Sequence, residues 1–388
     1  MTPQPPHPPG YRPNYIHLAI TVAGFLERIP PLALTPTWLA LSAIGCWTWG
    51  DLRLPAAVLL FGPILADGTG LALLPRAGRS FGPVTPPLLA LALTRTAIHA
   101  ALGLAWPTLP GLLLTTALQL AILAAALYAT WIEPFQLTVT SMALQSPKLD
   151  GHPPIRLLHI SDIHVEGITP RERNLLHQIE ALAPDVVVLT GDYLNLSSVN
   201  DPQAQTQAHD LLAQICAHAP GPVYAITGSP PVDRPEIVPR IFSDLPIIWL
   251  LDEIQDLHLN GHTLRLVGLR CTADRSRDIP RLRRLLDGPS GTPSPFTLLL
   301  YHSPDLMPEA VGMEVDLYLC GHTHGGQIRL PLWGAIVTSS DFWKRYEMGR
   351  YEEGGTTLYV SRGLGVEGLG APRARFLAPP EIILWTLS

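Results

Sequence analysis

The sequence predicts a chain of two structural classes: an all-helical transmembrane region of about four helices, followed by an α/β domain. Two observations support this prediction. Residues 1–133 carry a net charge of +2 and few ionisable side chains, whereas the remaining residues carry a net charge of −8. Long apolar stretches fill the first third of the chain, and short apolar runs alternating with helical patterns fill the rest.

Four apolar stretches in the first third are each close to the ~20 residues that a helix needs to cross the hydrocarbon of a bilayer. Tryptophans lie near several of their ends, as an interfacial aromatic belt requires. The alternative, a buried helical bundle in a soluble protein, fits poorly with stretches this long and this poor in charge. The predicted spans are Leu32 to Gly50, Leu54 to Leu74, Pro86 to Trp106 and Leu109 to Ile132.

The chain before the first span is rich in proline, so we expect residues 1–13 to form a disordered lead, and no signal-peptide pattern is evident. Tyr15 to Leu26 is apolar but too short to span, and we interpret it as an interfacial helix. The predicted domains are residues 1–31 (lead and interfacial segment), 32–133 (transmembrane region), 134–154 (connector) and 155–388 (α/β domain).

The placement of basic residues decides the predicted orientation. With four spans, the N-terminus, the second-to-third loop with Arg76 and Arg79, and the segment with Lys148 and Arg156 share one side, and Arg53 lies on the other. The positive-inside rule places the more basic side in the cytoplasm. We therefore predict a multi-pass protein of the cell membrane with a cytoplasmic C-terminal domain, an orientation that the loss of one span would reverse.

Two residues of opposite charge lie inside the predicted spans. Asp67 lies about seven residues before the end of the second span, and Arg95 about nine residues after the start of the third. These depths are similar in antiparallel neighbours, so we expect an ion pair between Asp67 and Arg95, with His99 one turn further on. Such a pair either stabilises the helices or marks a transport path, and a single pair does not make a relay.

Composition argues against two other classes of protein. The four cysteines form no Cys-x-x-Cys pair, so neither a disulfide framework nor a thiolate zinc site is indicated. The acidic C-terminal domain lacks the basic face that non-specific nucleic-acid binding needs. We therefore expect no nucleic-acid partner.

From Ile155 onward, short apolar runs separated by turn residues predict strands, and amphipathic stretches between them predict helices. This alternation is typical of a layered α/β domain, in which site residues usually follow the ends of strands. The predicted strands are Ile155 to Ile160, Val186 to Thr190, Val223 to Thr227, Leu264 to Leu269, Thr297 to Tyr301, Leu317 to Cys320, Thr357 to Val360 and Ile382 to Leu387, and the predicted helices are Arg171 to Ala183, Gln203 to Ala217 and Ile279 to Leu286.

Two carboxylates and four imidazoles follow the predicted strands. In an extended backbone His322 and His324 point to the same face. Mixed nitrogen and oxygen ligands suit Mn, Fe or Zn better than an all-oxygen Mg or Ca site. Two such metals would lower the pKa of a shared water and brace an in-line displacement at phosphorus. The six residues are Asp162, His164, Asp192, His302, His322 and His324.

In this order and placement, the chain from about Ile155 to the C-terminus resembles the calcineurin-like metallophosphoesterases. Their segments are Asp-x-His, Gly-Asp, Gly-Asn-His-Asp/Glu, a lone His and Gly-His-x-His, and four of these five are present. The resemblance implies a four-layer β-sandwich of two mixed sheets flanked by helices. It also implies two divalent metals, one held by Asp162, His164 and His324 and the other by His302 and His322, with Asp192 bridging and with Asp192 and His302 as the catalytic residues.

The tail, with Tyr359 to Gly365 and Pro379-Pro380-Glu381, resembles the bacterial membrane-anchored branch of that family. Its best-understood relatives include enzymes that cleave the pyrophosphate of UDP-diacylglucosamine. The resemblance therefore implies hydrolysis of a phosphoester or pyrophosphate bond in a lipid-linked or nucleotide-linked substrate, with the bilayer as a partner. An anchor would raise the effective concentration of such a substrate.

One segment departs from the family pattern: Gly228-Ser229-Pro230-Pro231 stands where the family has Gly-Asn-His-Asp/Glu. Ser229 is a poor substitute for the amide ligand of the second metal, and Pro230 cannot exchange a proton. Three interpretations follow: a slow or narrowly specialised hydrolase, an enzyme that recruits its acid elsewhere, or a non-catalytic metal-binding sensor or scaffold. Asp233 and His209 are candidate recruits, with ordinary surface residues as the alternative for each.

Two further segments mix basic and apolar residues. Arg281-Leu282-Arg283-Arg284 either meets lipid head groups or forms a solvated helix face. Phe342-Trp343-Lys344-Arg345-Tyr346 lies in a predicted loop after the last histidine pair, where it either binds substrate, touches the membrane or packs internally.

Overall fold

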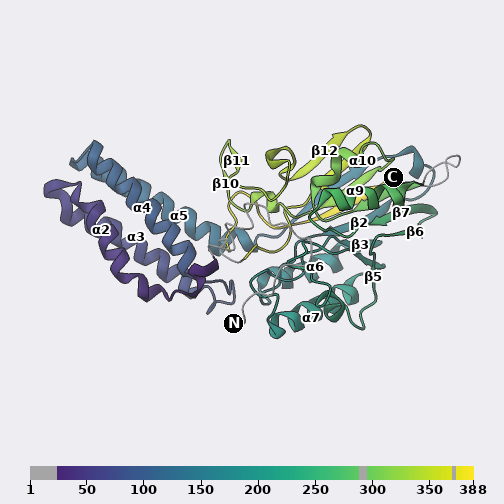
Figure 1. Cartoon of the computed structure of the whole chain (residues 1–388), viewed down its shortest axis with the longest axis horizontal. Coiled ribbons are helices and arrows are strands. Elements are labelled where there is room, and N and C mark those ends of the chain that lie inside the picture. The colour runs from purple at the N-terminus through teal and green to yellow at the C-terminus, as the bar shows by residue number, and fades with distance from the viewer. Residues whose placement is uncertain (1–23, 288–294, 369–372) are drawn as a thin grey trace. The chain divides into compact units, whose positions relative to one another are not determined.

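A computed structural model describes residues 24–287, 295–368 and 373–388, and the chain separates into two compact units (Figure 1). One unit contains the apolar helices up to Glu133 together with a short C-terminal segment up to Phe376. The other contains Pro134–Glu367 and Leu377–Ser388. Most of the predicted interfacial helix, Tyr15 to Leu26, lies outside the described residues.

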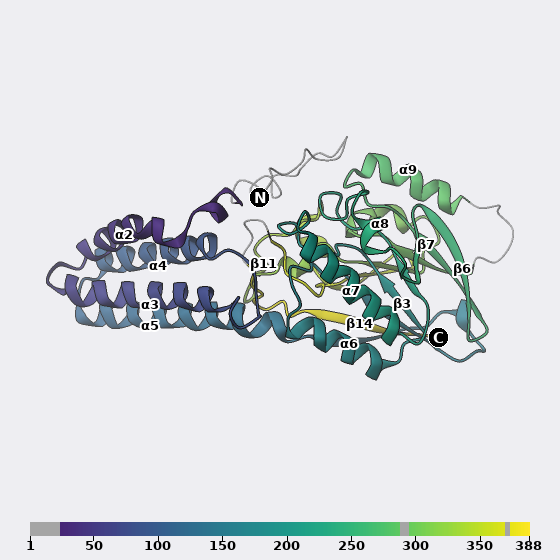
Figure 2. The same ribbon diagram turned by 90° about the horizontal axis from the view of Figure 1, so that it is seen from below.

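In its described residues, the first unit is an antiparallel bundle of four helices, seen side by side in Figure 2. Three helical stretches in the described part of the chain are long and apolar enough to cross a membrane: Gly50–Leu73, Thr85–Ala105 and Leu109–Phe135. Large apolar side chains, such as Leu54, Val58 and Leu113, point outward and are exposed. The four helices are α2 (Thr35–Trp47), α3 (Arg53–Leu73), α4 (Thr85–Ala105) and α5 (Leu109–Leu127).

The helix in the first predicted span is shorter than the sequence suggests. α2 has 13 residues and follows a four-residue 3₁₀ turn, Pro31–Leu34. At about 1.5 Å per α-helical and about 2.0 Å per 3₁₀ residue, the two together reach about 28 Å, close to the ~30 Å of a hydrocarbon core. Prolines at positions 30, 31 and 36 explain the late start of the α-helix, because proline removes a backbone donor. The number of spans therefore stays at three clear candidates and one short one.

The predicted ion pair lies at the centre of this bundle. Arg95 donates to both oxygens of Asp67, at 2.7 and 3.0 Å, and both side chains are buried. Gln119 of α5 completes the cluster, because it accepts from Arg95 through its side chain at 2.9 Å and donates to the Arg95 carbonyl at 3.1 Å. His99 is buried one turn further on, beside the ring of Trp49. The polar groups thus face inward while apolar groups face outward, the reverse of a soluble bundle.

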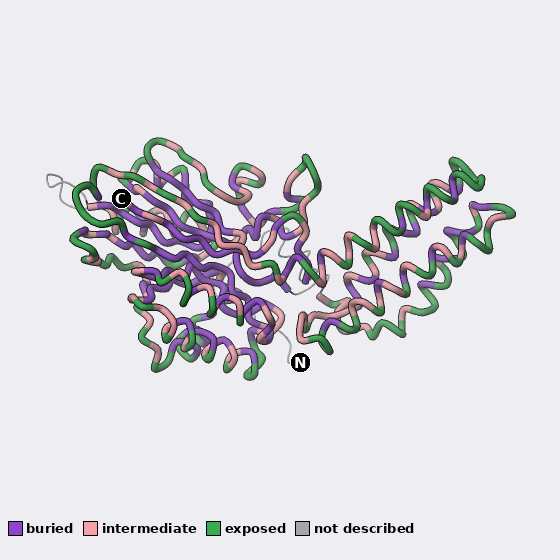
Figure 3. Tube along the Cα trace, turned by 180° about the vertical axis from the view of Figure 1, so that it is seen from behind, coloured by how far each residue is buried: buried purple, intermediate pink, exposed green. Residues whose placement is uncertain are grey.

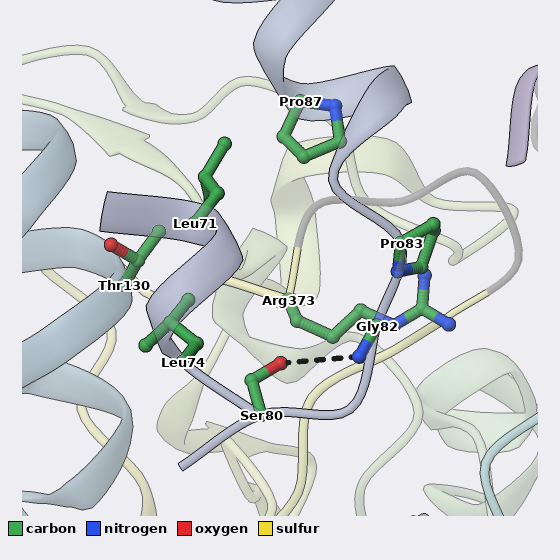
Figure 4. Close-up of a pocket in the computed structure, with 8 residues that line it drawn as sticks. All are labelled: Leu71, Leu74, Ser80, Gly82, Pro83, Pro87, Thr130 and Arg373. Atoms are coloured by element: carbon green, nitrogen blue, oxygen red, sulfur yellow. Dashed lines mark hydrogen bonds between the residues drawn. The ribbon is translucent and has the colours of Figure 1, made fainter. Parts of the chain in front are cut away.

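The C-terminal part of the chain also contributes to the helical unit. Arg373 pairs with Glu27 at 3.0 Å, and Phe376 packs edge-on against Tyr128. The Arg373 stem lies against Gly82, where an added Cβ would come within 2.5 Å of it, so this close approach requires glycine. Figure 4 shows a small pocket that Arg373 and Gly82 line together with Leu71, Leu74, Ser80, Pro83, Pro87 and Thr130.

The second unit is built on two mixed six-stranded sheets. In the first, β2 to β5 run parallel and β14 runs antiparallel to β2; in the second, β7, β8, β9 and β13 run parallel. The first sheet, in spatial order, is β1 (Thr138–Leu144), β14 (Glu381–Leu387), β2 (Ile155–Ile160), β3 (Val186–Leu189), β4 (Val223–Ala225) and β5 (Ile247–Trp249). The second is β12 (Gly349–Glu353), β13 (Thr356–Val360), β9 (Leu317–Cys320), β8 (Phe296–Leu300), β7 (His262–Gly268) and β6 (Glu253–Leu259).

The period-two alternation of the strands explains the layers. Leu298 and Leu300 of β8 lie in the core between the two sheets, whereas Leu299 faces outward and packs in a second cluster with Leu282 of α9 (Arg275–Leu286) and Met307 of α10 (Met307–Ala310). Helices α6 (Pro170–Leu182) and α7 (Pro202–His218) lie on the other side of the sandwich (Figure 1). In Figure 3 the buried part of the trace, in purple, runs through the middle of this domain, and exposed segments lie around it. The predicted helix–sheet–sheet–helix layering is thus present.

Several strands were not predicted. The predicted connector, residues 134–154, contains β1, which pairs in parallel with β14 near the C-terminus of the chain. β5, β6 and β12 also lie outside the predicted strands. Sheet-edge strands such as β1 have partners distant in sequence and a mixed burial pattern, so local periodicity identifies them poorly.

Candidate metal centre

The six predicted ligands come together where the strands of both sheets end. Asp162 and His164 follow β2, and Asp192 follows β3. His302 follows β8, and the segment with His322 and His324 follows β9. Because β2 and β3 run parallel in one sheet, and β8 and β9 run parallel in the other, the carboxyl ends of each pair lie at the same edge.

Asp162, His164 and His324 form one buried cluster, with one ligand atom from each lying within 4.8 Å of the others. The Nε2 atoms of the two histidines face each other at 3.0 Å. The Nδ1 atom of His164 lies 3.1 Å from the carbonyl of Leu194, which fixes the orientation of the ring. One oxygen of Asp162 accepts from the backbone of His322 at 3.0 Å, and the other is buried without a hydrogen-bond partner.

Asp192, His302 and His322 form the second cluster. The Nδ1 atom of His302 lies 2.8 Å from the carbonyl of Thr190, so its Nε2 atom is directed at Asp192, 3.1 Å away. The same carboxylate oxygen of Asp192 lies 3.7 Å from Nε2 of His164 in the first cluster. Asp192 therefore lies between the two clusters.

Ser229 occupies the place of the missing asparagine. Its hydroxyl donates to Asp192 at 3.1 Å and lies 3.1 Å from Nε2 of His302 and 3.3 Å from Nδ1 of His322. Its backbone N–H also donates to Asp192 at 2.6 Å. Ser229 therefore contacts all three groups of the second cluster. A serine hydroxyl can bind a metal only as a weak neutral ligand.

Five of the six predicted ligands have a left-handed backbone. The φ angles are 51° at Asp162, 47° at His164, 57° at Asp192, 71° at His322 and 53° at His324. Residues other than glycine seldom adopt this conformation, which costs on the order of 1–3 kcal/mol each and is concentrated at functional sites. The strand ends are therefore strained in the way that aims these side chains at a common centre.

Two glycines let the backbone of a neighbouring strand end approach the carboxylates of this centre closely. An added Cβ at Gly321 would lie 1.9 Å from Asp162 Oδ2, and one at Gly228 would lie 2.2 Å from Asp192 Oδ1. Each carboxylate thus rests against backbone that has no side chain. A larger residue at either position would displace a predicted metal ligand.

The electrostatics of the clusters favour bound cations. Burial lowers the pKa of His302, but the charge and hydrogen bond of Asp192 outweigh it and raise the pKa to about 10. Burial likewise lowers the pKa of His164, and the charges of Glu367, Asp192 and Asp162 raise it above the usual value. Burial raises the pKa of Asp192, yet His302 brings it well below the usual range. The carboxylates therefore favour positive charge at His302 and His164, whereas burial and the charge of His302 lower the pKa of His322.

These features fit a pair of divalent ions. The buried oxygen of Asp162 lacks a partner, and two imidazole nitrogens face each other across 3.0 Å. A metal bound by all three groups would satisfy the oxygen and remove the need for a proton between the rings. Nitrogen and oxygen donors in this proportion suit Mn, Fe or Zn.

Glu367 is a site residue that the sequence analysis missed. Its carboxylate lies 3.8 Å from Nε2 of His164, and it forms a third group of metal-ligating type with His164 and Asp192. Its backbone N–H donates to the side chain of Gln327 at 2.6 Å. Glu367 comes two residues after the Ser361-to-Gly365 segment. In the sequence, this closeness to a family-like segment is the one signal that could have marked Glu367 as a site residue.

Neither Asp233 nor His209, the two candidates for a replacement general acid, directs a proton donor at the metal centre. Asp233 is buried rather than at the surface, and its carboxylate accepts from the backbone N–H groups of Asp192, Tyr193 and Gly228 at 2.7–3.1 Å. It therefore positions the Asp192 loop. Burial and the charge of Asp192 raise its pKa to about 7. His209 is half-buried on α7, with Nδ1 near the carbonyl of Ile241.

The two segments that mix basic and apolar residues, 281–284 and 342–346, contain both packed and exposed side chains. Arg281 pairs with Asp252 at 2.8 Å and with Asp278, so it belongs to the domain surface. In the loop after the metal centre, Tyr346 is fully buried and packs against Phe342, whereas Trp343 is half exposed. The internal-packing alternative therefore holds for Phe342 and Tyr346 and fails for Trp343.

Restoring the asparagine should strengthen the second half of the centre. We expect Ser229→Asn to tighten the weaker metal by about 10- to 100-fold, because an amide oxygen is a better ligand than a hydroxyl at this position. Titration of the metal-free protein with Mn²⁺, followed by electron paramagnetic resonance of the free ion, measures both affinities. Ser243→Asn, at an exposed serine, is the matched control. Equal affinities in both variants would show that Ser229 does not lie in the metal's coordination sphere.

A family model described as calcineurin-like phosphoesterase matches residues 155–326. The chain is 32% identical over 273 residues to the uncharacterized metallophosphoesterase YkuE of Bacillus subtilis, an alignment that covers 67% of this chain and 88% of the relative. It is 26% identical over 327 residues to the UDP-2,3-diacylglucosamine pyrophosphatase LpxG of Chlamydia trachomatis, covering 69% and 95%. A solved dimetal phosphatase from Danio rerio superposes with a TM-score of 0.34 at 11% identity, covering 57% and 90%.

Proposed function

The chain belongs to the calcineurin-like metallophosphoesterase family, and on that premise we propose that it hydrolyses a phosphoester or pyrophosphate bond in a lipid-linked or nucleotide-linked substrate at a membrane. The observation that supports this most strongly is the position of Asp192. One of its oxygens lies 3.1 Å from His302 of the second cluster and 3.7 Å from His164 of the first. A carboxylate so placed can bridge two metal ions.

Each half of the centre has its own role in the proposal. When bound, two divalent ions would supply an activated water and would neutralise charge on the phosphoryl oxygens. Asp162, His164 and His324 would hold one ion, and His302 and His322 would hold the other, with Asp192 shared. The carbonyls of Thr190 and Leu194 keep the His302 and His164 rings turned toward the centre.

The second half is the weaker one, and this limits the chemistry. Ser229 supplies a hydroxyl instead of an amide, and Pro230 has no side-chain proton to give to a leaving group. A leaving group that departs as a stable anion needs no such proton. We therefore propose that the bond cleaved joins a phosphoryl group to another phosphate, as in a pyrophosphate, rather than to an alkoxide.

The substrate class rests on the relatives and on the bundle. One relative is named as a UDP-2,3-diacylglucosamine pyrophosphatase, which acts on a lipid-linked nucleotide. The three long apolar helices of this chain, with apolar side chains pointing outward, would place it in a bilayer where such substrates are found. A sugar–lipid pyrophosphate of this kind is therefore the substrate that we propose to test first.

The bundle also supports a cytoplasmic catalytic domain. Arg79 donates to the carbonyl of Trp131 at the end of the bundle where α5 continues toward Pro134. Arg76 and Arg79 thus lie at the end from which the catalytic domain follows, while Arg53 lies at the start of α3 at the opposite end. The more basic end faces the cytoplasm by the positive-inside rule. Activity of a periplasm-specific reporter fused to the C-terminus would overturn this orientation.

The substrate proposal can be tested with detergent-purified protein loaded in turn with Mn, Fe or Zn. We expect turnover of UDP-2,3-diacylglucosamine in mixed micelles and slower turnover of the soluble diester bis(p-nitrophenyl) phosphate. Turnover of the diester without the lipid would keep the phosphoesterase and reject the lipid substrate. Turnover of neither, with at most one metal bound per chain, would favour the non-catalytic sensor or scaffold.

A further inference from the structure

A short hairpin just after the metal centre carries large apolar side chains into solvent. It consists of β10 (Arg329–Leu330), the turn 331–333 and β11 (Gly334–Ala335), and it stands out from the domain in Figures 1 and 3. Single exposed apolar residues are common, but a cluster of this kind on a soluble surface marks an interaction site. The exposed residues, with their exposed fractions, are Leu330 (49%), Leu332 (110%), Trp333 (68%), Ile336 (44%), Val337 (42%) and, next to the hairpin, Trp343 (50%).

The hairpin is held in place by polar contacts at its base. Arg329 pairs with Glu347 at 2.8 Å and donates to the carbonyl of Gly325 at 2.7 Å. The backbone N–H of Ala335 donates to the same glutamate at 3.3 Å. Lys344 covers the ring of Trp333, 4.5 Å from its centroid, and donates to its carbonyl. The apolar tip is therefore presented by a fixed scaffold.

The tip residue is unfavourable both for the fold and for solubility. Leu332 is fully exposed and has a φ angle of +64°. A glycine or asparagine would adopt this turn at lower cost and would not expose apolar surface to water. A leucine at this position, followed by a tryptophan, costs energy in water and would recover it in an apolar environment.

The hairpin is also connected to the metal centre. The carbonyl of Ile328 accepts from Ile336 at 3.2 Å, and an added Cβ at Gly326 would lie 2.3 Å from the Cβ of Ala335. The carbonyl of Glu347 accepts from Thr323, between the two histidines, at 2.6 Å. Whatever surface the tip enters is thereby held at a fixed position relative to the loop with His322 and His324.

The chemistry of the tip fits a lipid interface better than a protein. Tryptophan and leucine beside lysine and arginine are the residues that settle at the boundary between head groups and acyl chains. The apolar helices of the same chain would hold a bilayer nearby.

We infer that the hairpin 329–335, with the adjoining Ile336 and Val337 and with Trp343, inserts into the interfacial layer of the bilayer and holds the metal centre at the lipid surface. The inference rests on the proposed membrane location of the chain and does not require any particular substrate. It assigns the hairpin to substrate access: a lipid whose phosphate lies at the head-group level would reach the centre without leaving the membrane.

The test uses the full-length chain in nanodiscs with a fluorescent probe at the tip. Leu332→Cys, made in a Cys216→Ser background because the other three cysteines are buried, carries an environment-sensitive label. Gln255→Cys, on the exposed edge strand β6, is the matched control. We expect nanodiscs with shallow spin-labelled lipids to quench the tip probe several-fold more than the control. Equal quenching at both positions would overturn the inference, as would self-quenching between labelled chains, which would indicate a second copy as the partner.

A second arm measures the consequence for turnover. The double variant Leu332→Asp/Trp333→Asp, with both changes at exposed positions, should raise the KM for the lipid substrate in vesicles by about tenfold or more, while kcat on bis(p-nitrophenyl) phosphate stays unchanged. An unchanged KM for the lipid would contradict the assigned role. If the protein turns over neither substrate, the proposed function fails, but probe quenching still decides whether the hairpin enters the bilayer.

Discussion

Asp192→Asn should lower turnover by at least about 10³-fold, because it removes the one carboxylate that both clusters share. Asp192 lies within 3.1 Å of His302 and 3.7 Å of His164, so an amide in its place would weaken both halves at once. Metal ions that stabilise phosphoryl charge contribute several kcal/mol, and each 1.4 kcal/mol is about tenfold in rate. Steady-state hydrolysis of bis(p-nitrophenyl) phosphate measures the loss.

Measurements on the same preparation must show that the variant loses turnover through loss of metal and not through misfolding. Metal content per chain should fall to one or less, while the far-ultraviolet circular dichroism stays that of the wild type. Asp210→Asn, at an exposed position on α7, is the control and should keep both metals and full turnover. Wild-type rates in Asp192→Asn would remove Asp192 from the reaction and with it the bridging role proposed for it.

The second large effect concerns the leaving group. Since Pro230 cannot protonate a departing oxygen, esters of alcohols should react about 10²- to 10⁴-fold more slowly than esters of nitrophenol or of a phosphate, a range set by the usual contribution of a general acid. A series of phosphodiesters with leaving groups of increasing pKa measures this as a steep fall in kcat/KM. The steepness itself reports how much negative charge the leaving oxygen carries in the transition state.

A variant that restores the Asn-His pair of the family shows whether the missing histidine causes this dependence on the leaving group. Ser229→Asn/Pro230→His should flatten this dependence by speeding the poor leaving groups most, whereas Pro231→His, one position further on, should leave it steep. Equal rates for good and poor leaving groups in the wild type would show that another residue donates the proton. Glu367, near His164, would then be the first to substitute.

Most of the buried strands, and the polar residues that follow them, could be predicted from the sequence because each is marked by a pattern of neighbouring residues. Each buried strand, such as Val186–Leu189, is a short apolar run, and a side chain of metal-ligating type follows it within a few residues. The parallel arrangement then brings the strand ends together. The Asp67–Arg95 pair was predictable in the same way, from depth along two helices, and it is confirmed.

Other features depend on contacts between distant parts of the chain. β1 is a strand because β14, more than 200 residues later, offers it a free edge. Gln119 forms hydrogen bonds with Arg95 because α5 packs beside α3 and α4. No local sequence pattern predicts this packing. Glu367 reaches His164 only because the tail returns to the ends of the strands. In each case the partner is set by the fold and not by spacing in the sequence.

Ser229 shows what a motif departure means once its surroundings are known. From the sequence it is a missing ligand. In the structure its hydroxyl contacts Asp192, His302 and His322, so the second half of the centre is altered rather than absent. The family membership then favours an enzyme with a weak second metal site over a centre that has lost its function.

Turnover measured against the number of metal ions bound decides whether the protein is a two-metal phosphoesterase. Metal-free protein is titrated with Mn²⁺, and at each step the bound ions per chain and the rate on bis(p-nitrophenyl) phosphate are determined together. If two ions act with Asp192 between them, the first equivalent should bind tightly with little activity, and the rate should rise as the second, weaker equivalent binds. A rate that reaches its maximum with one ion, or stays at zero with two, would contradict a two-metal phosphoesterase.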